Sequence, residues 1–197
     1  WNVTPYANEL DGERAAACIV RFGATQAVRC DVERLVASNN VFGAAWLNPP
    51  YDHDAAASGS KRVEFRYLRH AWKWVQDGGL ALWCVYRQHI TQEAAAFLAK
   101  HSSRVDVWAL PGKHLGEYDQ MVVAAVKGVS LDPAVLYEQI IRNRENPQPL
   151  TVLAEPLYHL PSPRVIQRFV FAPDMLDETA GLKLIEEQGA WKTSGFQ

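Results

Sequence analysis

Short apolar runs alternate with amphipathic segments along the first two thirds of the chain. The apolar runs, which predict strands, are residues 3–10, 26–30, 41–47, 80–86, 104–110 and 118–126. Segments 11–22, 61–75 and 92–100 carry helical patterns, and Asp11 and Thr91 are suitable N-caps for the first and third of these. Strands that alternate with helices predict an α/β fold with a doubly wound, mostly parallel sheet.

The pattern changes towards the carboxyl terminus. The strands at 104–110 and 118–126 are joined without a helical segment, which predicts that the sheet ends in an antiparallel hairpin. After Gly128 come a helix candidate at 132–144, a proline-rich stretch and a further helix within 174–188. We therefore expect a sheet domain over residues 1–128, and a proline-rich helical extension, or the start of a further domain, over residues 129–197.

Composition sets limits on the class of protein. Hydrophobic residues make up 48% and charged residues 21% of the chain, which is typical of a soluble globular domain. No apolar run is long enough to span a membrane. The 3 cysteines and 6 histidines show no metal-ligand spacing, so we predict no metal site and expect reduced thiols in a cytoplasmic protein. Because the formal net charge is −2, binding to nucleic acid would require a local basic face.

The segment after the strand at 41–47 carries the strongest chemical signal. Pro49 and Pro50 end the strand, since proline cannot donate to a strand ladder, and they force extended geometry on the residues before them. The resulting stiff turn presents the Asn48 side-chain amide, the Pro49 carbonyl and the Tyr51 ring. Two such oxygens could each accept an N–H from an amine on a flat ring, which would stabilise the positive charge that develops as the amine attacks a methyl donor. Tyr51 could stack on the ring itself.

This tetrapeptide, Asn48-Pro49-Pro50-Tyr51, resembles the catalytic motif of the class I S-adenosylmethionine-dependent methyltransferases that modify adenine N6 in DNA. The resemblance implies that Asn48 and the Pro49 carbonyl hold the amine and that Tyr51 stacks on the base. The same four residues also occur in methyltransferases that act on glutamine in proteins or on guanine in RNA, so these substrates stay open.

A longer resemblance covers roughly residues 6–128. The run 47–52, the aromatic pair Trp72 and Trp74, and the strand at 120–123 are similar to a bacterial and plasmid-borne group of adenine-methyltransferase-like domains of undetermined function.

Two acidic residues end the first two predicted strands. The resemblance implies that Glu9 accepts hydrogen bonds from the ribose hydroxyls of S-adenosylmethionine and that Asp31 accepts one from the adenine amine of this cofactor. The alternative is that these carboxylates only cap helices or face water.

One part of the family pattern is missing. Its members carry an earlier strand and a glycine-rich turn, which residues 1–5 do not supply, and neither Gly78-Gly79 nor Pro111-Gly112 precedes a suitable helix. We expect that the chain is an amino-terminally incomplete fragment. The alternative is a cofactor-deficient methyltransferase fold that serves as a nucleic-acid-binding module.

A basic segment follows the polar, small-residue stretch at 52–60, which we expect to be a flexible loop. Its members, predicted to contact phosphates, are Lys61, Arg62, Arg66, Arg69 and Lys73. The last four recur at steps of three and four residues and would share one helix face. This face predicts DNA, or alternatively RNA, as the partner. An ordinary solvated helix face is the other interpretation.

Overall fold

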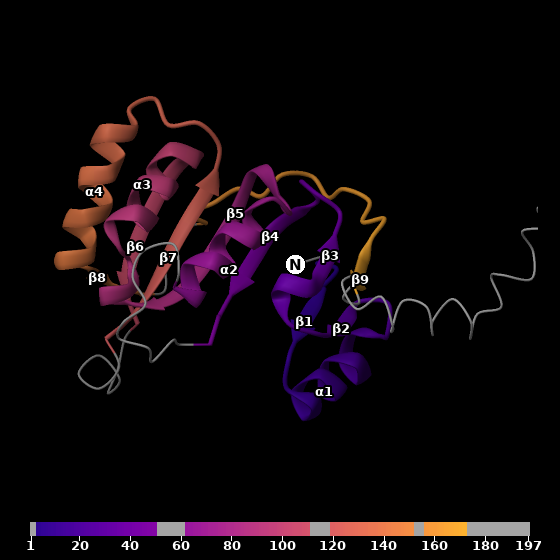
Figure 1. The fold of residues 1–197 in the computed structure, drawn as a ribbon. Helices are drawn as coiled ribbons and strands as arrows, with labels where there is room; N and C mark the ends of the chain where they lie inside the picture. The colour runs from indigo at the N-terminus through magenta and orange to yellow at the C-terminus, as the bar shows by residue number, and fades with distance from the viewer. Residues whose placement is uncertain (1–2, 51–61, 111–118, 152–155, 173–197) are drawn as a thin grey trace, which may run out of the picture. The chain divides into compact units, whose positions relative to one another are not determined.

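The computed structural model describes residues 3–50, 62–110, 119–151 and 156–172, and it divides into two compact units (Figure 1). Unit 1 contains residues 1–36 and 168–197, and unit 2 contains residues 37–167. Tyr51, Lys61, the predicted loop at 52–60 and the predicted helix within 174–188 lie outside the described residues. In the described part of the chain, every helix is too short or too polar to cross a bilayer.

Unit 1 begins with a parallel β-α-β arrangement. Strand β1 (Ala7–Glu9) and strand β2 (Ala27–Arg29) pair in parallel and are connected through helix α1 (Gly12–Phe22). The predicted N-cap is confirmed, because the Asp11 carboxylate accepts from the Arg14 backbone N–H at 2.9 Å. Gly23 ends the helix with a φ of 92°, a conformation that side-chain-bearing residues rarely adopt.

The rest of unit 1 contains a short helical turn and a pair of strands. A 3-10 turn, η1 (Val32–Arg34), is followed by strand β3 (Leu35–Ala37), which pairs with strand β9 (Phe169–Phe171) near the other end of the chain. The Tyr6 ring packs edge-on against Phe169, with ring centroids 5.1 Å apart. Such a pairing between distant segments leaves no local signal in the sequence, since each strand has only three residues.

Unit 2 is built on a mixed sheet. Its strands are β4 (Phe42–Leu47), β5 (Val75–Tyr86), β6 (Ser102–Ala109), β7 (Gln120–Lys127) and the short β8 (Gln148–Pro149). Their spatial order is β4-β5-β7-β6-β8, in which β4–β5 and β6–β8 are parallel and β5–β7 and β6–β7 are antiparallel. The α/β class and the predicted hairpin of the strands at 102–109 and 120–127 are confirmed. The sheet is mixed: β4, β5, β6 and β8 run in one direction, and β7 runs antiparallel between β5 and β6. The expected doubly wound arrangement is not confirmed.

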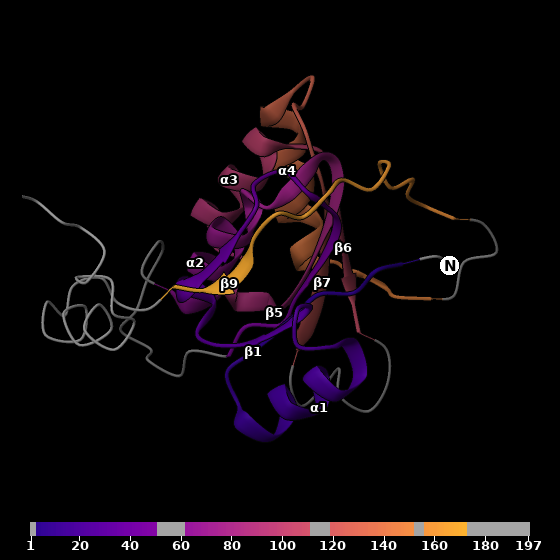
Figure 2. The ribbon, with the colours of Figure 1, turned by 90° about the vertical axis from the view of Figure 1, so that its right-hand side faces the viewer.

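One face of this sheet carries the helices and the hydrophobic core (Figures 1 and 2). The helices are α2 (Val63–Trp72), α3 (Gln92–His101) and α4 (Pro133–Glu145). Alternate residues of the central strands enter the core, among them Trp83 of β5, Val107 of β6 and Val123 of β7, each at most 3% exposed. Because side chains alternate along a strand, the neighbouring residues point to the opposite face, where Cys84, Val122 and Ala124 are also buried.

An extended segment, residues 156–167, makes contacts on the strands of the same unit; we call it the strap. The Tyr158 hydroxyl donates to the Asp106 carboxylate of β6 at 2.7 Å, and its ring stands edge-on to Trp108. Further along, Arg164 donates to the Asn40 carbonyl at 3.0 Å. Part of the proline-rich extension thus packs on the sheet in an irregular conformation, and its backbone is held by side-chain contacts.

The junction between α2 and β5 corrects the sequence prediction of a helix over 61–75 that stops at Gly78-Gly79. The helix ends at Trp72, and β5 starts at Val75 and includes both glycines. Gly78 has a φ of 78°, and a Cβ on Gly79 would lie 2.8 Å from the Gln76 carbonyl oxygen, so the glycines form an irregularity within the strand. Lys127 closes the junction by donating to the Trp72 and Val75 carbonyls.

The three cysteines differ in burial, because Cys30 and Cys84 are buried and Cys18 is half-buried. Cys18, Cys30 and Cys84 are all free, and burial raises the pKa of Cys84 to about 11. This thiol is therefore protonated at neutral pH and serves as a small apolar group in the sheet.

We predict that Tyr158→Phe destabilises unit 2 by about 1–2 kcal/mol, because it removes a hydrogen bond to a carboxylate at a half-buried site. Burial, together with the hydrogen bond to Asp106 and its charge, raises the pKa of Tyr158, so the hydroxyl remains a donor at neutral pH. Urea unfolding followed by circular dichroism measures the effect. His159→Gln, at the exposed neighbouring position, is the matched control, and equal midpoints for the two variants would contradict the role of the strap.

Candidate functional site

The Asn48-Pro49-Pro50 turn lies at the carboxyl end of β4. The strand pairs in parallel with β5 up to the Leu47–Trp83 pair, and the chain leaves the ladder at Asn48. Pro49 is buried, whereas Asn48 and Pro50 are exposed. A buried proline fixes the direction of the turn and leaves the Asn48 amide at the sheet edge, as predicted. The position of Tyr51 is outside the described residues.

Trp46 lies one strand period before Asn48 and is 62% exposed. A large aromatic residue this exposed is unusual for a strand. The sequence placed it within a buried run, and β4 in fact alternates between exposed and half-buried positions from Ala44 to Leu47. The exposed face of β4 therefore carries an aromatic ring close to the predicted amine acceptor.

Glu9 and Asp31 meet at one edge of the small parallel sheet of unit 1. Glu9 is the last residue of β1 and is paired with Arg29 of β2, and Asp31 follows β2 by two residues. Parallel strands bring their carboxyl ends to the same edge, so the structure brings together the two residues that the resemblance assigned to a cofactor. Each residue of this pair also has a local role in the fold.

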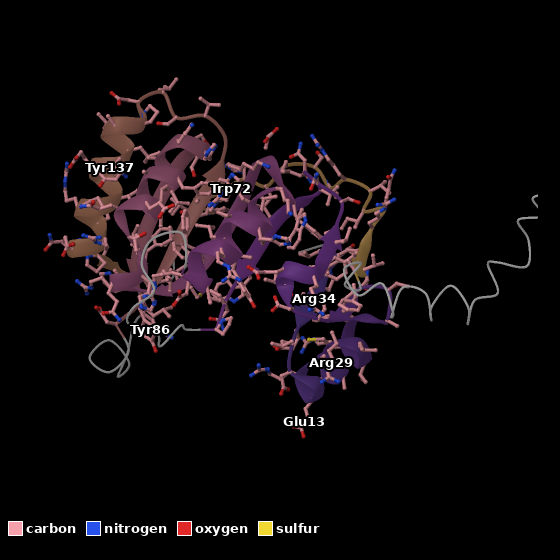
Figure 3. All side chains as sticks on the ribbon, viewed as in Figure 1. Glu13, Arg29, Arg34, Trp72, Tyr86 and Tyr137 are labelled. Atoms are coloured by element: carbon pink, nitrogen blue, oxygen red, sulfur yellow. The ribbon has the colours of Figure 1, made fainter. Side chains whose placement is uncertain are left out.

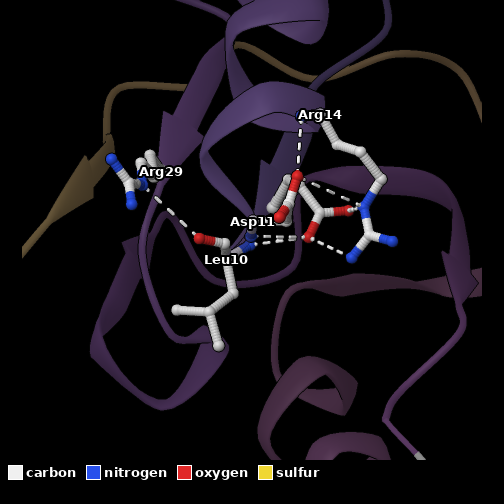
Figure 4. A network of polar contacts seen from close by, with 5 residues as sticks. Leu10, Asp11, Arg14 and Arg29 are labelled. Carbon is white, nitrogen blue, oxygen red and sulfur yellow. Dashed lines mark hydrogen bonds and ion pairs between the residues drawn. The ribbon is translucent and has the colours of Figure 1, made fainter.

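The Glu9 carboxylate is engaged by its own neighbours (Figure 4). Its Oε1 accepts from the Leu10 and Asp11 backbone N–H groups at 2.8 and 3.0 Å and from Arg14 Nη2 at 3.1 Å. Its Oε2 accepts from Arg14 Nε at 3.1 Å. Two ribose hydroxyls could bind Glu9 only if Arg14 moved, and the Arg14 side chain is 72% exposed, so water can replace this contact at small cost.

These contacts change the protonation of Glu9. Burial alone would raise its pKa, but the backbone hydrogen bond from Asp11, the hydrogen bond and charge of Arg14 and the hydrogen bond from Leu10 together lower it below the ordinary 4.5. The carboxylate is therefore ionised at neutral pH. Asp31 is the N-cap of η1 and accepts from the Glu33 N–H at 2.9 Å, which is the alternative role that the sequence left open.

The predicted basic face is only partly present. Arg66, Arg69 and Lys73 are exposed along α2, with the Arg69 guanidinium over the Phe65 ring at 5.8 Å. Arg62 departs from the prediction, because it is 8% exposed and its guanidinium contacts Glu64 and His89. Sequence spacing placed Arg62 on the helix face, but it is the residue before the first turn, where its side chain can point inward to an acidic partner.

Three residues near the Asn48 turn were missed by the sequence analysis. Glu64 is fully buried in the first turn of α2, His89 is 6% exposed in the 3-10 turn η3 (Arg87–His89), and Tyr86 ends β5 (Figure 3). Tyr86 had the same kind of signal as Asn48, a polar group at the carboxyl end of an apolar strand. Nothing in the sequence pairs Glu64 with His89, which are 25 positions apart and meet only in the tertiary structure.

Neither a protein-family model nor a curated protein sequence matches the chain. A solved structure, that of a candidate class I S-adenosylmethionine-dependent methyltransferase from Listeria monocytogenes, is similar at a TM-score of 0.34 and 16% sequence identity. The similarity covers 54% of this chain and 43% of the Listeria protein, so the chain spans less than half the length of that protein. A match this partial leaves the activity to be argued from the residues themselves.

We predict that Glu9→Gln lowers the hydrogen-exchange protection of the Leu10 and Asp11 amides at neutral pH, because both N–H groups donate to the charged carboxylate. Since the folded-state pKa is lowered, the stabilisation is present above about pH 4.5 and is lost as the pH falls through the folded value. The two proteins should therefore converge at low pH in an NMR exchange series. Glu13→Gln, on the exposed first turn of the same helix, is the control, and equal protection at pH 7 would refute the assignment.

Proposed function

We propose that this chain is the catalytic part of an enzyme that transfers a methyl group from S-adenosylmethionine to the exocyclic N6 amine of adenine in DNA. The observation that carries the proposal is the Asn48-Pro49-Pro50 turn at the carboxyl end of a strand that is paired in parallel with β5. Ligands of α/β sheets bind at this edge, where loops and side chains extend beyond the hydrogen-bonded ladder of the strands. The tetrapeptide alone occurs in several kinds of protein, and its place at this edge agrees with a catalytic role.

The chemistry follows from the groups that the turn presents. An aromatic amine is a poor nucleophile because its lone pair is delocalised into the ring. Asn48 Oδ1 and the Pro49 carbonyl would each accept one amine N–H, which favours a tetrahedral nitrogen and stabilises the charge that develops as the N–C bond forms. The methyl–sulfur bond of the donor would break as the N–C bond forms, which neutralises the sulfonium, and the amine would release one proton to water. Because burial of the Pro49 ring limits movement of the turn, these acceptors would be preorganised.

S-adenosylmethionine would supply an electrophilic methyl group, and Glu9 and Asp31 are the residues proposed to hold it. Two carboxylates at one edge of a parallel strand pair fit a ligand that presents hydroxyl and amine donors. Glu9 fits after Arg14 has released it, and this release costs little at an exposed site.

DNA is the proposed substrate because of the exposed basic residues Arg66, Arg69 and Lys73 on the helix that follows the motif in sequence. A paired adenine is stacked in the duplex with its amine hydrogen-bonded to thymine, so the base would have to rotate out of the stack to reach Asn48. RNA or a protein glutamine would use the same acceptors, and the choice of substrate in the assay decides among the three.

A second candidate is a methyltransferase fold that binds nucleic acid without using the cofactor. The observation in its favour is the occupation of both Glu9 oxygens by Arg14. In the enzyme, Arg14→Ala should tighten S-adenosylmethionine binding by about two- to fivefold, the equivalent of one exposed ion pair. In the binding module, calorimetry should detect no cofactor heat for either the wild type or this variant.

The enzyme proposal predicts that tritium from labelled S-adenosylmethionine is incorporated into DNA by the wild type and that Asn48→Ala lowers this rate by at least about a hundredfold. Loss of one preorganised acceptor is the cause, so cofactor affinity should stay unchanged in calorimetry. The control is Gln139→Ala, at an exposed position of α4. Incorporation into RNA or protein but not DNA would transfer the proposal to that substrate, and equal rates for wild type and Asn48→Ala would overturn it.

The DNA proposal also predicts a weaker salt dependence when the basic face is removed. If all three side chains contact phosphates, the combined variant Arg66→Ala, Arg69→Ala, Lys73→Ala should reduce the slope of log K against log salt by about 2–3. Fluorescence anisotropy with a labelled duplex at several salt concentrations measures this slope. Arg142→Ala, exposed on α4, should leave it unchanged. An unchanged slope in the triple variant would show that this face does not contact DNA.

A further inference from the structure

Three ionisable side chains form a buried cluster in unit 2. Glu64 Oε1 lies 2.7 Å from His89 Nδ1 and 3.3 Å from Arg62 Nη2, and Arg62 Nη2 lies 2.7 Å from His89 Nε2. Their exposures are 0% for Glu64, 6% for His89 and 8% for Arg62. The cluster therefore holds formal charge away from water, at a place where the surrounding core is apolar.

The cluster joins helix α2 to the 3-10 turn η3. Arg62 and Glu64 lie at the start of α2, the helix that follows the motif in sequence, and His89 lies in η3 directly after β5. A buried ion cluster is a poor source of stability, because desolvation offsets much of the attraction, and apolar replacements are often as stable. What the cluster does provide is a directional link between α2 and η3.

The other side of η3 is also anchored. Arg87 Nε donates to the Asp119 carboxylate at 2.9 Å, and its Nη1 donates to the Glu145 carbonyl at 3.0 Å. Arg144 Nη1 donates to the Ile90 carbonyl at 2.9 Å, one residue past the turn. Contacts from α2, the start of β7 and α4 thus fix this 3-10 turn at the carboxyl edge of the sheet.

The side chain of Tyr86 is oriented by its contact with the anchored turn η3. Its ring stands edge-on to the His89 ring, with centroids 5.4 Å apart and planes at 83°. Tyr86 is half-buried at the last position of β5 (Figure 3). The ladder of β4 with β5 ends at the Leu47–Trp83 pair, and Tyr86 follows Trp83 by three residues at the end of β5. Tyr86 and the Asn48 turn therefore lie at the carboxyl ends of two strands that are paired in parallel.

We propose that Tyr86 is a substrate-binding residue, an aromatic wall for the flat base whose amine Asn48 receives, and that Arg62, Glu64 and His89 are positioning residues that hold its ring. This inference rests on the proposed function, because it concerns the same site, but it makes its own claim about base binding. An aromatic side chain suits any nucleobase, so Tyr86 would add affinity, and Asn48 would select the amine.

The test is binding of a single-stranded oligonucleotide that carries 2-aminopurine, whose fluorescence reports stacking and needs no methyl transfer. Tyr86→Ala should weaken binding by about ten- to a hundredfold, since base–aromatic stacking is lost. Tyr86→Phe should bind within about twofold of the wild type, because the ring is kept. His89→Gln should give an intermediate affinity and shift the Tyr86 ring resonance in a spectrum of ¹³C-tyrosine-labelled protein. The matched control is the exposed His159→Gln, which should change neither readout.

The inference is overturned if the wild type does not bind the probe, if Tyr86→Ala binds as the wild type does, or if His89→Gln leaves the Tyr86 resonance in place. Circular dichroism of each variant confirms that unit 2 is folded, and the Tyr86→Phe result separates loss of the ring from loss of the fold. Failure of the proposed function is distinguishable. It would appear as absent methyl transfer by a wild type in which probe binding still depends on Tyr86.

Discussion

The pairing of β5 with β4 on one side and β7 on the other is the constraint on which unit 2 depends. This strand carries Ala81, Trp83 and Val85 into the core beneath α2 and α3, and truncation of a buried aromatic residue such as Trp83 costs about 3–5 kcal/mol. Its parallel register with β4 determines where the Asn48 turn leaves the sheet. Its antiparallel register with β7 brings the hairpin strand into the middle of the sheet. The site is therefore positioned by the most buried part of the unit.

Charged side chains at the strand ends have structural partners of their own. Glu9 binds Arg14 and two backbone amides, Asp31 caps η1, and Arg62 is buried with Glu64 and His89. Carboxylates and guanidinium groups at such positions are expensive to leave unsatisfied, so the fold supplies a partner wherever one is within reach. A ligand at Glu9 would compete with an existing ion pair. Access to this edge then depends on how easily an exposed arginine is released, and the ionised state of Glu9 is already established at neutral pH.

The Asn48 turn of unit 2 and the Glu9 edge of unit 1 differ in rigidity for a physical reason. The Asn48 turn follows a six-residue strand and contains a buried proline. The Glu9 edge belongs to strands of three residues each, with an exposed arginine as its main side-chain contact. Short strands with few ladder bonds bury little area, so they are less constrained than the long strands of unit 2.

Local signals in the sequence determined much of this protein. The caps at Asp11 and Thr91, the helix after Gly128, the apolar strands and the hairpin at 102–109 and 120–127 are found where the pattern predicts them, because propensity, capping and two-residue alternation act over a few residues. Only the tertiary structure decided the rest. Some features join residues that are distant in sequence, namely the pairing of β3 with β9, the contact of the strap with β6 and the contact of Glu64 with His89. Others depend on burial and close packing, namely the glycine irregularity within β5 and the inward orientation of Arg62. The packing of the whole unit selects these contacts, and no local pattern in the sequence predicts them.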